Sequence, residues 1–387
     1  KCFTSGGGRF SMDKGLCVNP VWPCAMTGAC SVLAGISGLD VLIHGSSGCY
    51  YYPRSLLKVP LFCTYLLESE IVFGTTGRLK EVVDGLSSAD RPVAVLNTCI
   101  PALTGEDLSG ALENKNAVLV DAPGFLGNAE EGAKTAYDCL GIKTDPSRNG
   151  VNIDGVSLLD LFWRGNLHEA ERLLRLMDIP VGVRLAKDRY ADLRKGAALH
   201  TVSVNPSYPS GVGTMLGSFL FTDVKDTCAN LAETFPDADI EPVLEEWRRA
   251  DEQMFYSSDK YLRKYEPPLA AVCAQESYAL FAKTMLERYF GAEVPVVLAR
   301  NRDAAHIPCE TDLTKIVRDI SAAGPDLILG STFEANAYPA ASFLGITPPD
   351  RSRVSIAARP IAGIEGGIMF LENVLNTLID AASHTKK

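Results

Sequence analysis

The sequence lacks the signatures of several common functional sites. It has no G-x-x-x-x-G-K-[ST] phosphate loop, no C-x-x-C pair and no H-E-x-x-H motif. These absences exclude the standard Walker-type nucleotide site, zinc ribbon and thioredoxin-like redox centre. No apolar run approaches the roughly 18 residues of a membrane span, and residues 1–15 lack the apolar stretch of a signal peptide. We therefore expect a cytoplasmic protein that makes no membrane contact.

Positive charge is also scarce. The 387 residues include 37 Lys and Arg against 47 Asp and Glu, which gives a formal net charge of −10. Nucleic acids attract clustered Lys and Arg, so we expect no nucleic-acid partner. With 47% hydrophobic residues, a chain of this length can build two or three domains with cores that need no disulfides.

From about residue 39 onward, short apolar runs alternate with amphipathic stretches, a pattern typical of βα units around parallel sheets. The expected strands are 40–44, 93–97, 118–121, 181–185, 199–204, 269–273, 294–299, 326–329 and 353–356. The clearest expected helices are 166–178, 239–264, 276–290, 312–323 and 363–381.

Two polar stretches rich in turn formers, 143–152 and 265–268, separate these units. The fold class predicted is α/β, with three Rossmann-like domains, each a mainly parallel sheet flanked by helices. The predicted domain ranges are 1–148, 149–266 and 267–387.

Cysteine is the unusual component. The chain has 11, an odd number, and seven of them lie in the first 99 residues. Cys24, Cys49 and Cys99 sit in loops beside Gly, Ser, Thr or Pro, and the last two directly follow expected strands. Because ligands bind at the carboxyl ends of parallel strands, these thiols can converge on one point. Thiolates select iron–sulfur clusters, Zn or Cu(I), although each residue can equally be a small buried side chain.

The other cysteines fit simpler roles. Cys2 and Cys17 flank a Gly-rich arm and could add a ligand, but a mobile arm is the favoured interpretation. The stretch 211–217 (GVGTMLG) approximates a dinucleotide motif and is better interpreted as a structural helix start. Buried side chains are expected for the cysteines in apolar or helical contexts: Cys30, Cys63, Cys139, Cys228, Cys273 and Cys309.

Five motifs follow one another in the first third of the chain: VNP-x3-C-x3-GA at residues 18–29, HGSSGCYYYPRS at 44–55, ESEIVFGTTGRLKEVV at 68–83, NTCIPALTGEDL at 97–108 and DAPGFLGNAEEG at 121–132. Two more occur late, GPDLILGS at 324–331 and PIAGIEGGIMFLENVLNTL at 360–378. In order and spacing they resemble the nitrogenase component 1 family, and most closely its β-type chains (molybdenum-iron protein beta chain-like).

This resemblance implies an N-terminal cluster-binding domain. Cys24, Cys49 and Cys99 would ligate an iron–sulfur cluster shared between subunits, either the [8Fe-7S] P-cluster type or [4Fe-4S]. An ATP-dependent [4Fe-4S] iron protein would donate the electrons, which fits the missing phosphate loop. The partner would be an α-type component 1 subunit, in a heterotetramer, or a second copy of this chain.

Departures from the family pattern shape the expected function. Gly124 stands where a β-type chain can offer a serine to its cluster, so serine ligation is not expected. The segments 198–208 and 353–363 contain no Cys and only one imidazole, that of His200. The chain is therefore not expected to hold the large molybdenum–iron cofactor by itself. It is also shorter than a dinitrogen-reducing β chain, which favours nitrogenase-like enzymes of other function.

Three functions follow from the resemblance. The first is a nitrogenase-like reductase subunit that relays electrons to a substrate site, with methylthio-alkane reduction as the favoured reaction. The second is a tetrapyrrole reductase of the dark-operative protochlorophyllide or nickel-sirohydrochlorin type with a [4Fe-4S] cluster, and the third is a scaffold for metallocluster assembly.

Residues beside the Cys49 loop have expected roles of their own. His44 is expected as a structural turn residue rather than a cluster contact. Arg54 would either neutralise cluster charge or pair with a carboxylate. Tyr50, Tyr51 and Tyr52 are expected to pack against a partner. The segment with Gly74 and Gly77 would shape the neighbouring loop or form a strand-to-helix turn.

Overall fold

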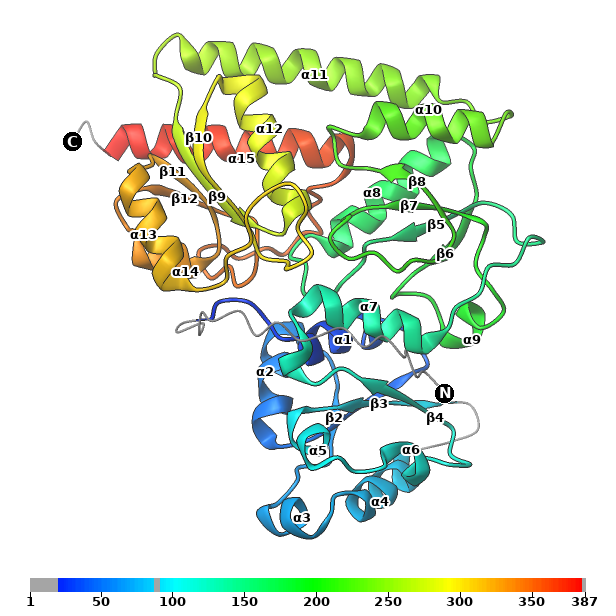
Figure 1. The fold of residues 1–387 in the computed structure, drawn as a ribbon. Coiled ribbons are helices and arrows are strands. Elements are labelled where there is room, and N and C mark those ends of the chain that lie inside the picture. The colour runs from blue at the N-terminus through cyan, green and yellow to red at the C-terminus, as the bar shows by residue number, and fades with distance from the viewer. Residues whose placement is uncertain (1–19, 87–90, 385–387) are drawn as a thin grey trace.

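The computed structural model describes residues 20–86 and 91–384. These residues form three four-stranded parallel sheets flanked by helices, which confirms the predicted α/β class (Figure 1). The N-terminal domain lies below the other two, which stand side by side. The sheets fall within residues 40–121, 151–218 and 269–345, and the domain boundaries proposed between them stay a prediction. Among the helices described, none combines the length and apolar character needed to cross a membrane.

The N-terminal sheet is buried on both faces, which explains why its strands read as continuous apolar runs. Ala94 and Leu96 of β3 face helices α1 and α7, whereas Val93 and Val95 face α4 and α6. The strands, in sheet order, are β2 (Phe62–Cys63), β1 (Asp40–His44), β3 (Val93–Asn97) and β4 (Ala117–Asp121). The helices are α1 (Ala25–Leu33), α7 (Ala129–Leu140), α4 (Thr76–Leu86) and α6 (Leu108–Ala111).

The other two sheets repeat the same arrangement. In the middle domain the strands are, in sheet order, β6 (Val181–Arg184), β5 (Val151–Asp154), β7 (His200–Ser203) and β8 (Thr214–Ser218). Its helices are α8 (Trp163–Leu176), α9 (Tyr190–Leu193) and α10 (Val224–Thr234). In the C-terminal domain the strands are β10 (Glu293–Ala299), β9 (Leu269–Ala274), β11 (Leu327–Gly330) and β12 (Ser342–Gly345). Its helices are α12 (Glu276–Phe290), α13 (Leu313–Ala323), α14 (Thr332–Ala337) and α15 (Gly363–His384). The long helix α11 (Glu241–Leu262) runs across both domains (Figure 1).

All three sheets have the same strand order, in which the first strand lies between the second and the third. Ligands bind such sheets at the carboxyl ends of the strands where the order reverses. In the middle and C-terminal domains these edges face each other. The Ser277 hydroxyl donates to Asn205 Oδ1 at 2.8 Å, and Gln275 Nε2 donates to the Tyr208 hydroxyl at 3.2 Å. The corresponding edge of the N-terminal domain lies between β1 and β3 and takes no part in these two hydrogen bonds.

Helices α1 and α7 touch through glycine. A side chain on Gly28 would overlap the backbone of Ala129, and one on Gly132 would overlap the carbonyl of Ala25. Only glycine permits this backbone approach without displacing a helix. The contact fixes the start of α1 against the start of α7.

The residues just before α1 are bound to the C-terminal domain. The Val21 amide donates to the Thr311 carbonyl at 3.0 Å, and Pro20 forms an isolated antiparallel bridge with Asp312. The segment leading to Cys24 therefore joins the N-terminal and C-terminal domains.

Two sequence predictions of local structure are wrong. Residues 353–356 form no strand, because Val354 and Ile356 are 90% and 96% exposed and Arg353 binds Asn373 and Thr377 of α15. The 211–217 stretch leads into strand β8 rather than a helix. Four strands, β2, β5, β8 and β12, were absent from the sequence prediction.

Candidate functional site

Cys24 is the N-cap residue of α1, with extended backbone at φ −77° and ψ 169°. Its backbone forms an isolated antiparallel bridge with Asn128, and the next amide, that of Ala25, donates to the Gly127 carbonyl at 2.9 Å. The Cys24 thiol makes no capping bond to α1 and lies 3.6 Å from the Thr27 hydroxyl. It is thus held by backbone contacts while its sulfur is available to a ligand.

Cys49 and Cys99 occupy matching places after neighbouring strands. Cys49 lies in the first turn of α2 (Ser47–Leu57), after β1, and Cys99 is the first residue of α5 (Cys99–Thr104), after β3. The Thr98 hydroxyl donates to the His44 carbonyl at 2.7 Å, which ties the two strand ends together. Both thiols therefore stand at the edge of the sheet where the strand order reverses.

The three thiols converge. A Cβ built on Gly124, in the short 3-10 helix η1 (Gly124–Leu126), would lie 3.1 Å from Cys24 Sγ and 3.2 Å from Cys99 Sγ. Burial raises the pKa of the Cys49 thiol, a hydrogen bond from Ser46 lowers it, and the nearby Cys99 and Cys24 thiols raise it. All three side chains are partly exposed. The structure thus brings together the cysteines that the sequence singled out.

The donor set fits an iron–sulfur cluster better than a single ion. Within residues 20–86 and 91–384, no three His, Cys, Asp or Glu side chains gather closely enough to hold one metal ion. Thiolates that each bind a different iron need not gather so closely, and cysteine is the usual ligand of such clusters. The missing side chain at Gly124 leaves space directly beside two of the sulfurs.

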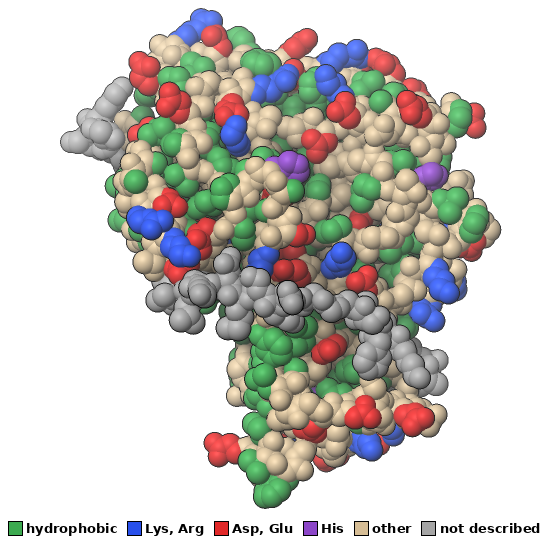
Figure 2. All heavy atoms as spheres, in the orientation of Figure 1, with side chains coloured by type: hydrophobic (Ala, Val, Ile, Leu, Met, Phe, Trp, Pro, Cys, Tyr) green, Lys and Arg blue, Asp and Glu red, His purple; other side chains and the backbone are tan. Residues whose placement is uncertain are grey.

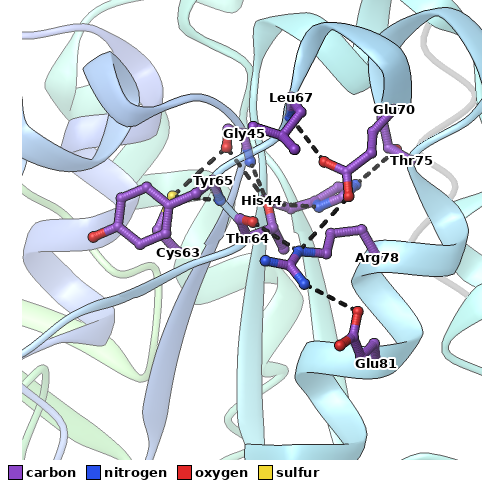
Figure 3. Close-up of polar contacts among 10 residues, drawn as sticks. All are labelled: His44, Gly45, Cys63, Thr64, Tyr65, Leu67, Glu70, Thr75, Arg78 and Glu81. Atoms are coloured by element: carbon purple, nitrogen blue, oxygen red, sulfur yellow. Dashed lines mark hydrogen bonds and ion pairs between the residues drawn. The ribbon is translucent and has the colours of Figure 1, made fainter.

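His44 lies in a buried polar cluster with Thr64 and Thr75 (Figure 3). Its Nδ1 lies 3.2 Å from the Thr64 hydroxyl and its Nε2 lies 2.9 Å from the Thr75 hydroxyl. Burial lowers the pKa of His44 to about 4, although the carboxylates of Glu106 and Glu70 oppose the shift. The expectation of a structural turn histidine is confirmed.

The same cluster shapes the loop after α3 (Glu68–Phe73). Glu106 accepts from the amides of Thr75 and Thr76 at 2.6 and 3.0 Å. Gly74, with φ 114°, joins α3 to α4, so this segment is a helix-to-helix connection rather than a strand-to-helix turn.

Cys63 is a supporting residue that sequence reasoning placed only in the core. Its thiol lies 3.6 Å from the Gly45 carbonyl and 3.8 Å from the Ser46 carbonyl, and the Tyr65 amide donates to its sulfur at 3.3 Å. It therefore contacts the backbone of the Cys49 loop. The only sequence signal for this contact is the position of Cys63 in the strand that pairs with β1.

Arg54 and the three tyrosines differ partly from expectation. The Arg54 guanidinium binds the Tyr50 hydroxyl and lies 5.4 Å from the centre of that ring, and it makes no carboxylate pair in the described chain. Tyr50 is buried in its own domain, so its expected role in partner packing is wrong. Tyr51 and Tyr52 are 61% and 46% exposed and stay available for a partner.

Large apolar side chains are exposed on the N-terminal domain. Hydrophobic side chains are visible on the N-terminal domain and at its lower tip, where α3 lies (Figures 1 and 2). Contiguous exposed apolar surface is typical of a binding face. The exposed apolar group of this domain comprises Tyr51, Tyr52, Tyr65, Leu67, Val72, Phe73, Leu103, Phe125 and Leu126.

The remaining cysteines differ in burial. Cys30, Cys63, Cys228 and Cys273 are buried as predicted, whereas Cys139 is partly exposed and Cys309 is exposed. Cys309 lies in the connection between β10 and α13, so its predicted burial is wrong. Cys2 and Cys17 lie outside the described residues.

A family model described as nitrogenase component 1 type oxidoreductase matches residues 24–379. The nitrogenase molybdenum-iron protein beta chain of Frankia alni is 34% identical over 193 residues, which covers 43% of this chain and 37% of that one. The nitrogenase iron-molybdenum cofactor biosynthesis protein NifE of Clostridium pasteurianum is 28% identical over 206 residues, 48% of this chain and 45% of that one. The alignments thus span less than half the length of these relatives.

Among solved structures, nitrogenase Cp1 at pH 6.5 has the same fold. It superposes with a TM-score of 0.79 at 18% identity, over 95% of this chain and 94% of that one. The likeness supports the three-domain architecture seen here.

Proposed function

Because this chain belongs to the nitrogenase component 1 type oxidoreductase family, and its relatives include β chains, we propose that it is a β-type subunit of a nitrogenase-like reductase. Cys24, Cys49 and Cys99 would hold an iron–sulfur cluster at the interface with a partner subunit. The observation that carries the proposal is the convergence of Cys24 and Cys99 on the bare backbone of Gly124, with Cys49 close to both.

The cluster, when bound, supplies one-electron chemistry at a potential set by its surroundings. This chain's three thiols would hold it, and the residues around them would limit its contact with water. Burial raises the pKa of the Cys49 thiol overall, and hydrogen bonds from Ser46 and Thr98 oppose part of that shift. Three thiols from one chain leave the ligand set incomplete, which supports a cluster completed by the partner, either of the [8Fe-7S] type or a [4Fe-4S] cluster.

The exposed apolar group supports an interface at the cluster. Each of three elements at the site carries both a site residue and exposed apolar side chains: α2 has Tyr51 and Tyr52, α5 has Leu103, and η1 has Phe125 and Leu126. A partner packed on these side chains would also cover the thiols. We propose an α-type subunit as this partner, in a heterotetramer.

The electron donor would bind a different part of the same domain. Val72 and Phe73 of α3 are 73% and 88% exposed, the latter among the most exposed apolar side chains described. We place here the docking surface of an ATP-dependent iron protein. The substrate site would lie in the partner, and methylthio-alkane reduction to a thiol and a hydrocarbon is the first activity to assay.

A second function is favoured by one comparison. The relative NifE is named as a cofactor biosynthesis protein, so a scaffold for metallocluster assembly is the alternative. A scaffold would hold a cluster on the same three thiols but would not turn over with an iron protein and ATP.

The test is anaerobic purification of the native complex, with subunit analysis and counts of iron and sulfide. Cys99→Ala should remove most of the cluster iron and its low-temperature paramagnetic signal. The matched control is Cys309→Ala, which changes an exposed thiol away from the site and should leave the iron count unchanged. Equal iron in both variants would refute the ligand assignment. Turnover with iron protein and ATP separates the reductase from the scaffold.

A further inference from the structure

The most exposed large apolar side chains that the structure describes lie in one short segment of the C-terminal domain. Val354 and Ile356 are 90% and 96% exposed, more than any other large hydrophobic residue in the described part of the chain. They lie in the connection between β12 and α15, where residues 351–359 are all exposed. Neighbouring apolar side chains that stand free in this way are typical of a binding surface.

The backbone of the segment is also without partners. Within the described residues, the amides of residues 353–358 donate no hydrogen bond. The chain makes no turn or bend from Arg353 to Ile356. In an extended run, successive side chains point to opposite sides, so Val354 and Ile356 share one side and Arg353 and Ser355 share the other. The segment thus has the alternation and the free backbone groups of an unpaired strand.

The segment is fixed to the rest of the protein on one side and at its end. The Arg353 guanidinium donates to Asn373 Oδ1 at 3.1 Å and to the Thr377 hydroxyl at 3.0 Å, both on α15. A side chain on Gly165 would overlap the Arg359 backbone, so the downstream end lies against α8. Arg353 therefore holds its side of the segment toward the protein, while the apolar side faces outward. A segment presented in this way loses less conformational entropy when a partner binds.

The segment borders the surface that the proposed function assigns to the partner subunit. Ile356 lines the same cavity as residues 55–59 at the end of α2. Helix α2 also carries Cys49 and the exposed side chains of Tyr51 and Tyr52. A subunit that covers the thiols and these tyrosines would reach the segment, so the two surfaces are continuous.

The charges beside the segment disfavour a second copy of this chain and favour an acidic partner. Arg351, Arg353 and Arg359 form no ion pair within the described residues. Two copies paired antiparallel, with Val354 opposite Ile356, would place Arg351 of one copy opposite Arg359 of the other. Like charges directly opposite each other destabilise a sheet, whereas Asp or Glu at these positions would form ion pairs with the arginines.

We propose that residues 353–357 become a β-strand in the complex, by pairing with an edge strand of the subunit that covers the thiols. That edge strand would carry alternating apolar side chains, which pack on Val354 and Ile356, and at least one carboxylate near Arg351 or Arg359. Main-chain hydrogen bonds supply the affinity in such pairing, and alternate side chains select the partner. The inference rests on the proposed function for the identity of the partner, and it adds a contact in a second domain.

The first test is hydrogen exchange of the purified, anaerobic complex, resolved to single amides in residues 351–360. Pairing along one edge protects every second amide, because successive amides of a strand point to opposite edges. We expect the paired amides to exchange at least about 100-fold more slowly than freely exposed amides. Exchange of every amide at the exposed rate would overturn the proposal. Uniform protection would overturn it as well, because it indicates burial without strand pairing.

The second test is assembly of variants, measured by sedimentation at several protein concentrations. Ile356→Asp should weaken assembly about tenfold or more, because it places a charge in the apolar contact. Ile356→Val keeps a branched apolar side chain and is the matched control, which should assemble as the wild type does. Circular dichroism shows that both variants fold, since the side chain is exposed in the chain itself. Equal assembly of the two variants would contradict the proposal.

Subunit analysis and iron counts separate this inference from the cluster proposal. A complex with its full iron content but without alternate protection overturns the strand pairing and leaves the cluster assignment intact. Alternate protection in a complex purified without iron supports the strand pairing and counts against the cluster. Alternate protection in a homodimer of this chain overturns the choice of partner.

Discussion

The sulfur atoms of Cys24 and Cys99 belong to different helices, yet they flank one backbone position at 3.1 and 3.2 Å from the point where a side chain on Gly124 would begin. Gly124 lies in a 3-10 turn, so the need for glycine comes from the space beside the sulfurs. Steric room at this residue is therefore part of the proposed cluster site.

Gly124→Ala should weaken cluster retention. The added methyl group would crowd both sulfurs, and overpacking of this kind costs about 1–3 kcal/mol, which corresponds to a roughly 5- to 150-fold change in affinity. We expect faster iron release to a chelator from the anaerobic complex. Gly85→Ala, on an exposed face of α4 with open space around it, is the matched control. Equal release rates in the two variants would contradict this role for Gly124.

Gly132→Ala should destabilise the N-terminal domain. The new side chain would meet the Ala25 carbonyl and push α1 away from α7, at a cost of about 1–3 kcal/mol. Urea denaturation measures the loss. Gly77→Ala in α4 meets nothing nearby and should be neutral or gain up to about 1 kcal/mol from helix propensity. A Gly132→Ala variant as stable as the wild type would show that α1 and α7 can move apart without a loss of stability.

His44 should make stability depend on pH. The pKa of His44 is about 4 in the folded chain, against an ordinary value of 6.5. Between these values the unfolded chain takes up a proton that the folded chain does not, so the free energy of unfolding falls as pH drops from 6.5 to 4. The contribution, present in full above pH 6.5, is at most about 3 kcal/mol.

His44→Asn should flatten this dependence in urea denaturation series at several pH values. The exposed His168 provides the control, since His168→Asn should leave the pH profile unchanged. A His44→Asn profile as steep as that of the wild type would assign the pH dependence to other groups.

Tyr278→Phe should weaken the join between the middle and C-terminal domains. The Tyr278 hydroxyl donates to Asp160 and accepts from Asn166 Nδ2 at 2.8 Å, all within a buried network. Its removal costs each partner one buried hydrogen bond and should cost about 1–3 kcal/mol in thermal or urea unfolding. Tyr256→Phe changes a 72% exposed hydroxyl on α11 and should have no measurable effect.

The prediction from sequence is most accurate for elements that are buried on both faces. Strands β1 and β3 were predicted to the residue, because each is an apolar run that ends at a polar turn. The two-residue strand β2 carries too little pattern to be found, and β5 begins inside a stretch that reads as a turn. The apolar residues at 354 and 356 suggested a strand but lie exposed.

Only those parts of the site that follow from local sequence and strand order could be predicted. Cys49 and Cys99 follow adjacent parallel strands, so their convergence follows from strand order alone. The role of Gly124 depends on how η1 folds back over two helices, and the role of Cys63 depends on which strand lies beside β1. Such contacts between distant segments leave no periodic signal in the sequence.

The residues around Cys24 couple the N-terminal domain to the C-terminal domain. Upstream, Val21 is bonded to Thr311, and downstream, Asn128 beside Cys24 donates to the Arg300 carbonyl at 3.0 Å. Arg300 in turn forms a buried ion pair with Glu334. A displacement of Cys24 would therefore be transmitted to both domains rather than to one loop alone. Loss of the proposed cluster should then weaken the contact between the two domains as well as the site itself.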